Sequence, residues 1–206
     1  MVLPVGREDD ATIAFVDLWR GILILCDLSQ IKDEPWLRYV PLQHRDSTML
    51  STGNPRLPRD LAVVNGHFND CGCVASELVA SVKSLLSLED DSWEPVCEME
   101  SSESEMDIES NPGFELLPDL DDDEGMRRTL PPFNGLRISL PTLSSDTDDH
   151  TVSFMAKVNF GDDEAWVIDV DTKNNRLKGV AEFDASRYTI IAYNHSRISK
   201  CLKRAR

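Results

Sequence analysis

The stretch TVSFMAKVNFGDDEAWVIDVDTKNNRLKGVAEFD, residues 151–184, decides the fold class of this chain. Its opening residues, 151–158, alternate between apolar and polar side chains, which is typical of a strand with one buried face. Residues 164–170 form a more continuous apolar run, which predicts a strand covered on both faces. Turn-forming residues at 160–163 and 172–175 separate the three apolar segments. The stretch therefore predicts an antiparallel meander within a larger sheet, because so few strands are rarely stable alone in water.

The residues before and after this meander contain further strand patterns. Strands are predicted at 13–18, 22–28, 37–42, 61–64, 67–70, 93–99, 136–140 and 188–193. Asn65-Gly66 indicates a hairpin, because this dipeptide suits the turn that joins twisted antiparallel strands. Pro95 restricts its own strand to a sheet edge or a strand start. In residues 74–88 the apolar side chains fall at helical spacing, so the local pattern alone predicts a short amphipathic helix.

The predicted strands recur at a regular spacing. The strand openings at Ile13 and Leu61 are 48 residues apart, and Val152 lies 91 residues further on, about twice that spacing. Repeats of about 40–50 residues, each a short antiparallel meander, are typical of propeller blades. We therefore expect a mainly β chain whose antiparallel meanders form a partial β-propeller-like array with a disordered acidic insertion. The expected parts are a flexible lead-in (1–10), a β-rich region of about two blade-like meanders (11–99), a disordered acidic segment (100–131), a β-meander (132–196) and a basic tail (197–206).

One segment accounts for the net charge of −16. The chain has 37 Asp and Glu against 21 Lys and Arg, and residues 89–124 contain sixteen acidic residues and no basic one. Because the residues from 100 onward are acidic, Ser-rich and poor in apolar side chains, we expect them to be disordered. Sixteen uncompensated carboxylates repel phosphates, so direct nucleic-acid binding is not expected.

The acidic segment has two interpretations, a solvated linker and an interaction tract for a basic protein partner. Two serines in it precede acidic residues by three positions, a spacing that acid-directed kinases favour, and each phosphate would add about −1.5 to −2 charge. The basic tail either contacts an anionic surface, acts as a nuclear signal, or neutralises the acidic segment. The residues concerned are Ser102 and Ser104 for phosphorylation, and Asp121, Asp122, Asp123 and Glu124 for the tract.

Several features predict an intracellular protein of the cytosol or nucleus, without a membrane segment. The N-terminal residues MVLPVGREDD are acidic where a secretory signal needs a long apolar core. The apolar run near Gly21 extends only over 22–26, far short of a membrane span. The five cysteines are odd in number and scattered, which indicates reduced thiols.

His67, Cys71 and Cys73 form the one cluster that resembles a metal site, with the spacing H-x3-C-x-C. Structural zinc generally needs four ligands, with two to four residues between paired cysteines. A fourth ligand would have to come from Cys97, His44 or elsewhere. We therefore favour ordinary hairpin residues over a metal ligand set, and expect no cofactor. No nucleophile motif and no phosphate-binding loop accompanies the histidines, so we do not expect an enzyme.

Several blocks of the sequence resemble a known family. They are IAFVDLWRGILILCDL (13–28), LRYVPL (37–42), RDLAVVNG (59–66), NPGFELLP (111–118), FMAKVNFGDDEAWVIDVDTKNNRLKGVAEFD (154–184) and SRISK (196–200). In this order they are similar to the plant family with domain of unknown function 1618, which is expanded in grasses. The resemblance runs from about Ala11 to Leu202 and implies a C-terminal portion of a longer β-propeller-like protein. It also implies strand rather than helix near 74–82. The family has no established activity, so it implies no catalytic residues.

Together these observations predict a β-rich protein that binds another protein and carries out no catalysis. One alternative is a metal-stabilised or enzymatic domain that uses the His67, Cys71 and Cys73 cluster. A second alternative is a marginally folded remnant of a longer family member, in which missing blades leave strand edges unpaired. The partner is unknown, and a basic protein would suit the acidic tract.

Overall fold

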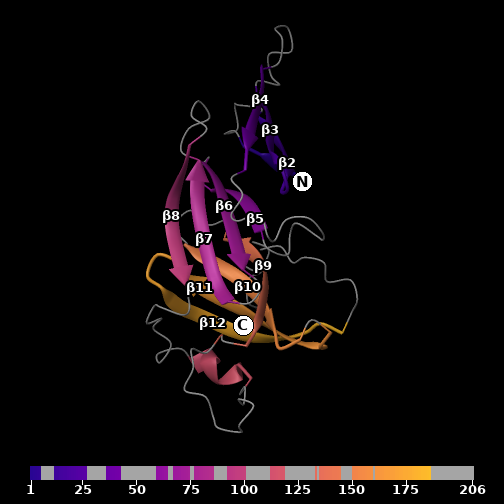
Figure 1. Ribbon diagram of the computed structural model, residues 1–206, viewed down its shortest axis with the longest axis vertical. Helices are drawn as coiled ribbons and strands as arrows, with labels where there is room; N and C mark the ends of the chain where they lie inside the picture. The colour runs from indigo at the N-terminus through magenta and orange to yellow at the C-terminus, as the bar shows by residue number, and fades with distance from the viewer. Residues whose placement is uncertain are drawn as a thin grey trace, which may run out of the picture.

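The computed structural model of the chain shows a mainly β protein built from three four-stranded antiparallel sheets (Figure 1). In each sheet, strands that follow one another in the chain are also neighbours in the sheet. The structure describes residues 1–5, 12–26, 36–42, 59–64, 67–74, 77–85, 92–100, 112–118, 133, 135–144, 150–159 and 161–186. Within these ranges there is one 3₁₀ helix, η1 (Pro112–Leu116), and no helix long and apolar enough to cross a membrane.

The twelve strands divide equally among the sheets. The first sheet contains β1 (Val2–Pro4), β2 (Ile13–Asp17), β3 (Gly21–Cys26) and β4 (Trp36–Pro41). The second sheet contains β5 (Arg59–Val64), β6 (His67–Val74), β7 (Glu77–Leu85) and β8 (Trp93–Glu100). The third sheet contains β9 (Arg137–Leu143), β10 (Thr151–Lys157), β11 (Glu164–Asp171) and β12 (Arg176–Asp184).

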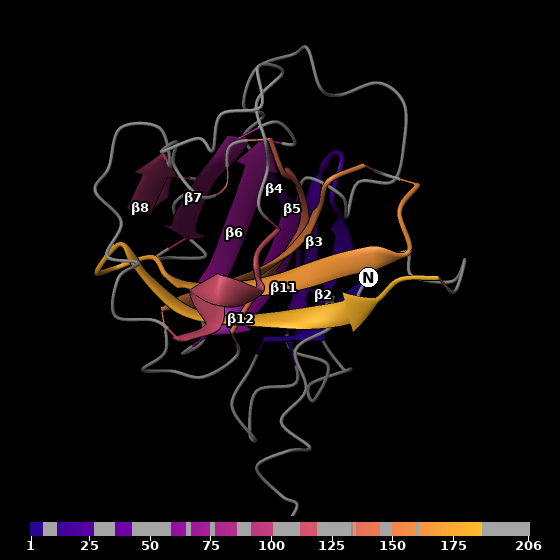
Figure 2. The ribbon, with the colours of Figure 1, turned by 90° about the horizontal axis from the view of Figure 1, so that it is seen from below.

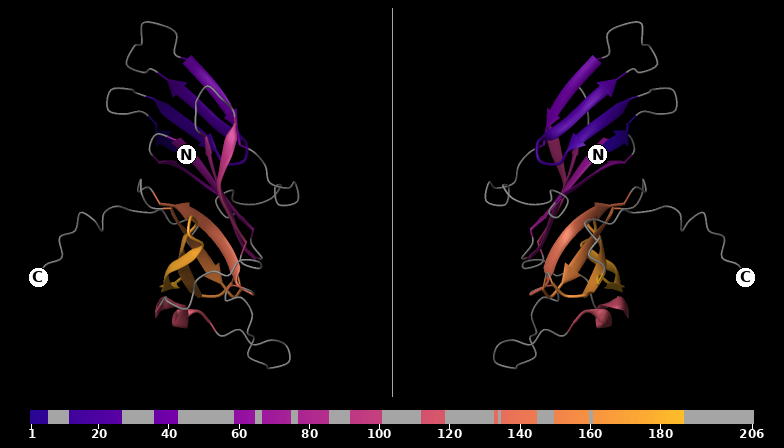
Figure 3. Two further views of the ribbon diagram at one scale, coloured as in Figure 1. Left: turned by 90° about the vertical axis from the view of Figure 1, so that its left-hand side faces the viewer. Right: turned by 90° about the vertical axis from the view of Figure 1, so that its right-hand side faces the viewer.

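The sheets are stacked, with the second sheet between the other two (Figure 3). One buried apolar cluster joins the first sheet to the second and includes Ile24 and Phe68. Another cluster joins the second sheet to the third and includes Cys71 and Phe154. The opening strands of the sheets lie near one another, because β1 contacts β5, and β9 contacts β5 and β6. The second sheet is therefore covered on both faces.

Strand β6 shows how the sequence supplies both faces of the second sheet. Phe68 belongs to the cluster shared with the first sheet, whereas Cys71 and Cys73 belong to the cluster shared with the third. This division follows from strand geometry, since successive side chains point to opposite faces. A strand between two sheets therefore needs apolar residues at odd and at even positions.

Most of the strands predicted from alternation and turns are confirmed. The segments 13–18, 22–28 and 37–42 correspond to β2, β3 and β4, and the meander 151–184 corresponds to β10, β11 and β12. The Asn-Gly hairpin is confirmed by the pairing of Val64 with His67 on either side of the turn. Strand β8, which contains Pro95, lies at the edge of its sheet. The segment 136–140 is part of a longer strand, β9, which extends to Leu143.

In the N-terminal half, one expectation is wrong and one open alternative is resolved. The flexible lead-in expected over 1–10 contains β1, which pairs with β2 through Val2 and Phe15. The sequence left 74–88 open between a helix from local spacing and a strand from the resemblance; the strand is confirmed over Glu77–Leu85, because β7 pairs with β6 on one side and β8 on the other. Hydrogen bonding along both edges of β7 overrides a local periodicity that favours a helix.

Two expectations in the C-terminal half also need correction. Part of the segment expected to be disordered, 100–131, forms η1, which lies against β12 (Figure 2). The indole Nε1 of Trp166 donates a hydrogen bond to the Leu116 carbonyl oxygen at 2.7 Å. Strand β11 is not fully covered on both faces, because Val167 and Asp169 are only half-buried on its outer side. Residue 100 is the end of β8, and 117 and 118 follow η1; the rest of 100–131 and the strand expected at 188–193 lie outside the described residues.

We expect Gly21→Ala to destabilise the first sheet. A Cβ atom at Gly21 would lie 2.6 Å from the Val40 carbonyl oxygen and 2.6 Å from the Tyr39 hydroxyl. The Val40 oxygen belongs to the paired strand β4 and cannot rotate away, so the cost is about 1–3 kcal/mol of unfolding free energy. Chemical denaturation measures this loss. Gly161→Ala is the control, because nothing lies within 4 Å of the added Cβ there, and its effect should stay within about 0.5 kcal/mol. Equal effects at the two positions would contradict the close packing at Gly21.

Candidate functional site

The three residues of the predicted metal cluster lie on one strand. His67, Cys71 and Cys73 are all on β6, at alternate positions that place their side chains on the face turned to the third sheet. His67 is half-buried, and both cysteines are buried. Neighbouring side chains on one face of a strand are about 6–7 Å apart, whereas a Zn–S bond is about 2.3 Å. The strand therefore holds the side chains of Cys71 and Cys73 apart and does not direct them toward one zinc ion.

Both thiols are held in their neutral form. Burial raises the pKa of Cys73 from 9.0 to about 12. Burial also raises the pKa of Cys71 well above 9.0, and the nearby Cys73, Asp70 and Asp60 add to this effect. Both cysteines lie within the buried apolar cluster between the second and third sheets, where they pack as small apolar side chains.

Cys97, a candidate for the fourth ligand, faces a different partner. It lies on β8 opposite Val82, and Val82 lies opposite Cys71, so one strand separates the two cysteines. The Cys97 thiol donates a hydrogen bond to the Thr172 carbonyl oxygen at 2.5 Å. In the part of the chain that the structure describes, no group of three or more His, Cys, Asp or Glu side chains is placed to hold a metal ion.

The other sequence-based candidates fall outside the described ranges. These are Ser102 and Ser104, the acidic run Asp121, Asp122, Asp123 and Glu124, the histidine His44 and the basic tail 197–206.

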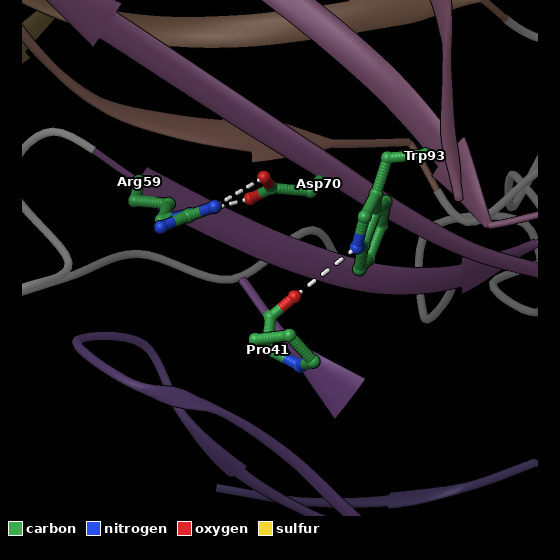
Figure 4. A network of polar contacts seen from close by, with 4 residues as sticks. All are labelled: Pro41, Arg59, Asp70 and Trp93. Atoms are coloured by element: carbon green, nitrogen blue, oxygen red, sulfur yellow. Dashed lines mark hydrogen bonds and ion pairs between the residues drawn. The ribbon is translucent and has the colours of Figure 1, made fainter. Parts of the chain in front are cut away.

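Figure 4 shows two polar contacts, an ion pair between β5 and β6 within the second sheet and a hydrogen bond from the second sheet to the first. Arg59 Nε donates to Asp70 Oδ1 at 2.6 Å, and its second guanidinium nitrogen contacts Asp70 Oδ2 at 2.5 Å. Only 11% and 9% of these side chains are exposed, so each charge depends on the other for solvation. Trp93 Nε1 donates to the Pro41 carbonyl oxygen at 3.3 Å, which ties β8 to the end of β4. The second of these contacts joins two sheets, and both have the character of structural contacts.

An acidic hollow of about 480 Å³ lies at the open end of the β11–β12 hairpin. It is lined by Asp163, Glu164, Ala165, Trp166, Glu182, Phe183 and Asp184. Hydrogen bonds from Ser186 lower the pKa of Asp184, so this carboxyl is charged at neutral pH. The hollow thus combines several carboxylates with two aromatic side chains, a set that suits a Lys or Arg side chain.

The outer face of the first sheet is apolar along two complete rows. In the first row Val2 pairs with Phe15, Phe15 with Leu23, and Leu23 with Tyr39. In the second row Pro4 pairs with Ile13, Ile13 with Leu25, and Leu25 with Leu37. The exposed fractions are 58% for Val2, 46% for Phe15, 59% for Leu37 and 53% for Tyr39. We call these eight residues the outer face.

The corresponding face of the third sheet has a different composition. Ser153 donates a hydrogen bond to Asp169 at 2.5 Å, and the Lys178 ammonium donates to the Thr151 hydroxyl at 2.7 Å. The apolar residues on that side, such as Met155, form a small buried cluster. Of the large apolar side chains exposed in the described part of the chain, none comes from β9 to β12. The two ends of the stack therefore differ in chemistry.

Comparison with known protein families identifies the family of this chain. Residues 15–153, more than half of the sequence, match the family described as "Protein of unknown function (DUF1618)". The chain belongs to the DUF1618 family. The matched region begins in β2, covers the second sheet and η1, and ends in β10, so it includes the two interfaces between sheets. No curated protein and no solved structure matches the chain.

Sequence reasoning missed the outer face of this DUF1618 protein. A signal was present, because the run Ile22–Cys26 on β3 has no polar residue at either alternate position. Such a run indicates a strand apolar on both sides. What the sequence did not show is the pairing that brings Val2, Phe15, Leu23 and Tyr39 into one row.

We expect the buried Cys73 to make the folded state less stable at alkaline pH. Its pKa is about 12 in the folded protein against 9.0 ordinarily, so between these values the unfolded state releases the proton and the folded state keeps it. The contribution of Cys73 to stability is fully present below about pH 9 and is lost as the pH rises toward 12. Denaturation at a series of pH values measures this loss. Cys73→Ala should lose less stability than the wild type between pH 8 and 11, and parallel curves would contradict the assignment.

Proposed function

We propose that this DUF1618 protein is a non-catalytic protein-binding protein that contacts a partner through the outer face. The observation that carries the proposal is the pair of unbroken apolar rows on a sheet whose other face is already buried. Exposed contiguous apolar patches of this kind mark interaction surfaces in soluble proteins. The outer face carries no acid, base or nucleophile, so the proposal includes no chemical step.

We further propose that the three sheets are successive blades of an open propeller-like array. Each sheet is a four-stranded meander in chain order, and the opening strands β1, β5 and β9 lie near one another. A blade inside such an array is covered by a neighbour on each side, so it is apolar on both faces. The first sheet has this property. In a longer family member, a further blade would occupy the outer face, which is the alternative that the resemblance suggested.

A basic protein segment is a second candidate partner, favoured by the acidic hollow. Its carboxylates lie at the end of a hairpin, and the aromatic ring of Phe183 supplies a surface for a cation. The acidic tract would add long-range attraction to the same partner. We propose an intracellular location for both interactions, which the free thiols of Cys71, Cys73 and Cys97 support.

Photocrosslinking tests the principal proposal. A photoreactive phenylalanine analogue in place of Leu37, an exposed residue of the outer face, should crosslink to a protein when the full chain is irradiated in cells. The same analogue in place of the exposed Lys173, in the turn at the opposite end of the β11–β12 hairpin from the hollow, is the control and should give no crosslink. Absence of any protein adduct at position 37 would contradict the proposed function.

A titration with a lysine-rich peptide tests the second candidate. Attraction between exposed charges weakens with salt, because the screening length falls from about 10 Å at 0.1 M to about 3 Å at 1 M. Neutralising the hollow by Glu182→Gln and Asp184→Asn, or the tract by Asn and Gln at Asp121, Asp122, Asp123 and Glu124, should slow association more than it speeds dissociation.

Glu94→Gln is the matched control for the titration, because it removes one exposed charge from β8, away from the hollow. This control variant should bind the peptide like the wild type at each salt concentration. An affinity that is independent of salt, or equally reduced in the control, would contradict the basic-partner candidate.

A further inference from the structure

We propose that the outer face is a self-association surface, on which the outer face of a second copy of this chain docks to form a two-fold symmetric dimer. This inference rests on the proposed function, since it names the occupant of the same face. It is argued below from the charge, the polar groups and the two unlike ends of the stack.

The outer face is suited to a copy of itself because it carries no charge. Its eight members are Val2, Pro4, Ile13, Phe15, Leu23, Leu25, Leu37 and Tyr39. In a two-fold interface the same patch meets itself, so any charge on it faces a like charge or must find a partner across the axis. An uncharged face avoids both requirements. Asp17, the next residue after Phe15 on the same side of β2, borders the outer face with its side chain 51% exposed, and its carboxylate lies 3.9 Å from Arg20.

The polar groups at the outer face are already hydrogen-bonded within one chain. The Tyr39 hydroxyl donates to the Arg20 carbonyl oxygen at 2.8 Å. The Asp17 carboxylate accepts a hydrogen bond from the Trp19 amide at 2.9 Å. Covering the eight residues therefore leaves the Tyr39 hydroxyl with its partner, and the charged Asp17 carboxylate must stay at the rim in contact with water, because burying a polar group without full compensation is the main cost of covering such a surface. The hydrogen bond from Tyr39 to Arg20 also holds the Tyr39 ring across Gly21, so the ring is ordered before a second copy docks.

The outer sides of the first and third sheets differ in chemistry, and this difference determines the symmetry of the proposed dimer. A head-to-tail arrangement would place the outer face of one copy on the outer side of the third sheet of the next, and would continue as a filament. That side carries the charged groups of Asp169 and Lys178, which would lose their hydration against an uncharged apolar face. Among the described residues, the outer face holds half of the exposed large apolar side chains, and we infer that it meets its own counterpart on the second copy. The assembly therefore stops at two chains and does not continue as a filament.

The size of the outer face indicates a reversible dimer. Four strands about 4.8 Å apart and five residues with a rise of about 3.4 Å span roughly 19 by 17 Å. Two such faces bury roughly 650 Å² in total when each is taken as flat, which is below the size of standard specific interfaces and in the range of weak, transient contacts. The two sheet interfaces within the chain show that its sheets pack in this face-to-face manner.

Sedimentation of the purified full chain at increasing concentration is the test. We expect the average mass to rise from 23.2 kDa toward twice that value between about 1 and 200 μM protein, without larger species. Raising the salt concentration should strengthen the dimer, because each copy carries a net charge of −16. Self-association through the acidic tract and the basic tail would weaken with salt instead, and that result would overturn the proposal.

Charged substitutions identify the surface. Leu37→Asp and Phe15→Asp should each weaken the dimer at least about tenfold, since a buried unpaired carboxylate is costly. Ala181→Asp places the same charge at an exposed position of β12 and should leave the dimer unchanged. Fluorescence of the buried Trp93 and Trp166 confirms that each variant is folded. Leu37→Ser is a milder variant, and it should weaken the dimer less than Leu37→Asp does.

The outcomes separate this inference from the proposed function. A folded wild-type chain that stays monomeric up to about 200 μM overturns self-association, as does a dimer that tolerates Leu37→Asp. If the analogue at position 37 then crosslinks to a different protein in cells, the proposed function stands and the second copy is the wrong occupant. If it crosslinks to nothing, both fail. A crosslink between two copies, lost in the Phe15→Asp background, supports both.

Discussion

The arrangement of the protein depends on the burial of the second sheet on both faces. Its strands supply Phe68 and Leu61 to the cluster with the first sheet, and Cys71 and Cys73 to the cluster with the third. Each fully buried large apolar side chain contributes about 1.5–3 kcal/mol through the hydrophobic effect, so neither outer sheet can be removed without exposing a core face. Polar groups that enter this region must find partners there. Asp70 finds Arg59, and the Asp60 carboxylate accepts a hydrogen bond from the Leu143 amide at 3.1 Å.

The same stacking explains why the sequence-based metal candidates act as core residues. His67, Cys71 and Cys73 were singled out for their residue types, yet Cys71 and Cys73 are buried in the cluster with the third sheet, whereas His67 is half-buried at the start of β6. The high pKa of the two thiols follows from this burial. The η1 segment shows the converse effect. It lies in the most acidic part of the chain, and it is ordered because Trp166 and β12 provide a surface and a hydrogen-bond partner.

The two ends of the stack suggest how the protein works with others. The third sheet presents hydrogen-bonded polar groups, as expected of a face in contact with water. The first sheet presents an apolar outer face of the kind that elsewhere in the same chain is covered by another sheet. The protein-binding role that we propose rests on this difference, and a second copy of the chain is the occupant that we propose for the outer face. Tyr39 supports this role, because its hydroxyl is already bonded to Arg20 and its ring remains apolar.

The sequence by itself determined the fold class and most strands. The alternation in 151–158, the turn residues after Asp171 and the Asn65-Gly66 dipeptide act between near neighbours, so they predicted β10 to β12 and the β5–β6 hairpin. Tertiary structure decided the elements that depend on distant partners. The segment 77–85 became strand β7 because β6 and β8 hydrogen-bond to it, and Val2–Pro4 became β1 because the edge of β2 accepts it. The outer face belongs to the second group, since Val2, Phe15, Leu23 and Tyr39 form one row only after four strands have paired in register. Local patterns specify how a segment is built, whereas a surface assembled across strands exists only once backbone pairing has set their alignment.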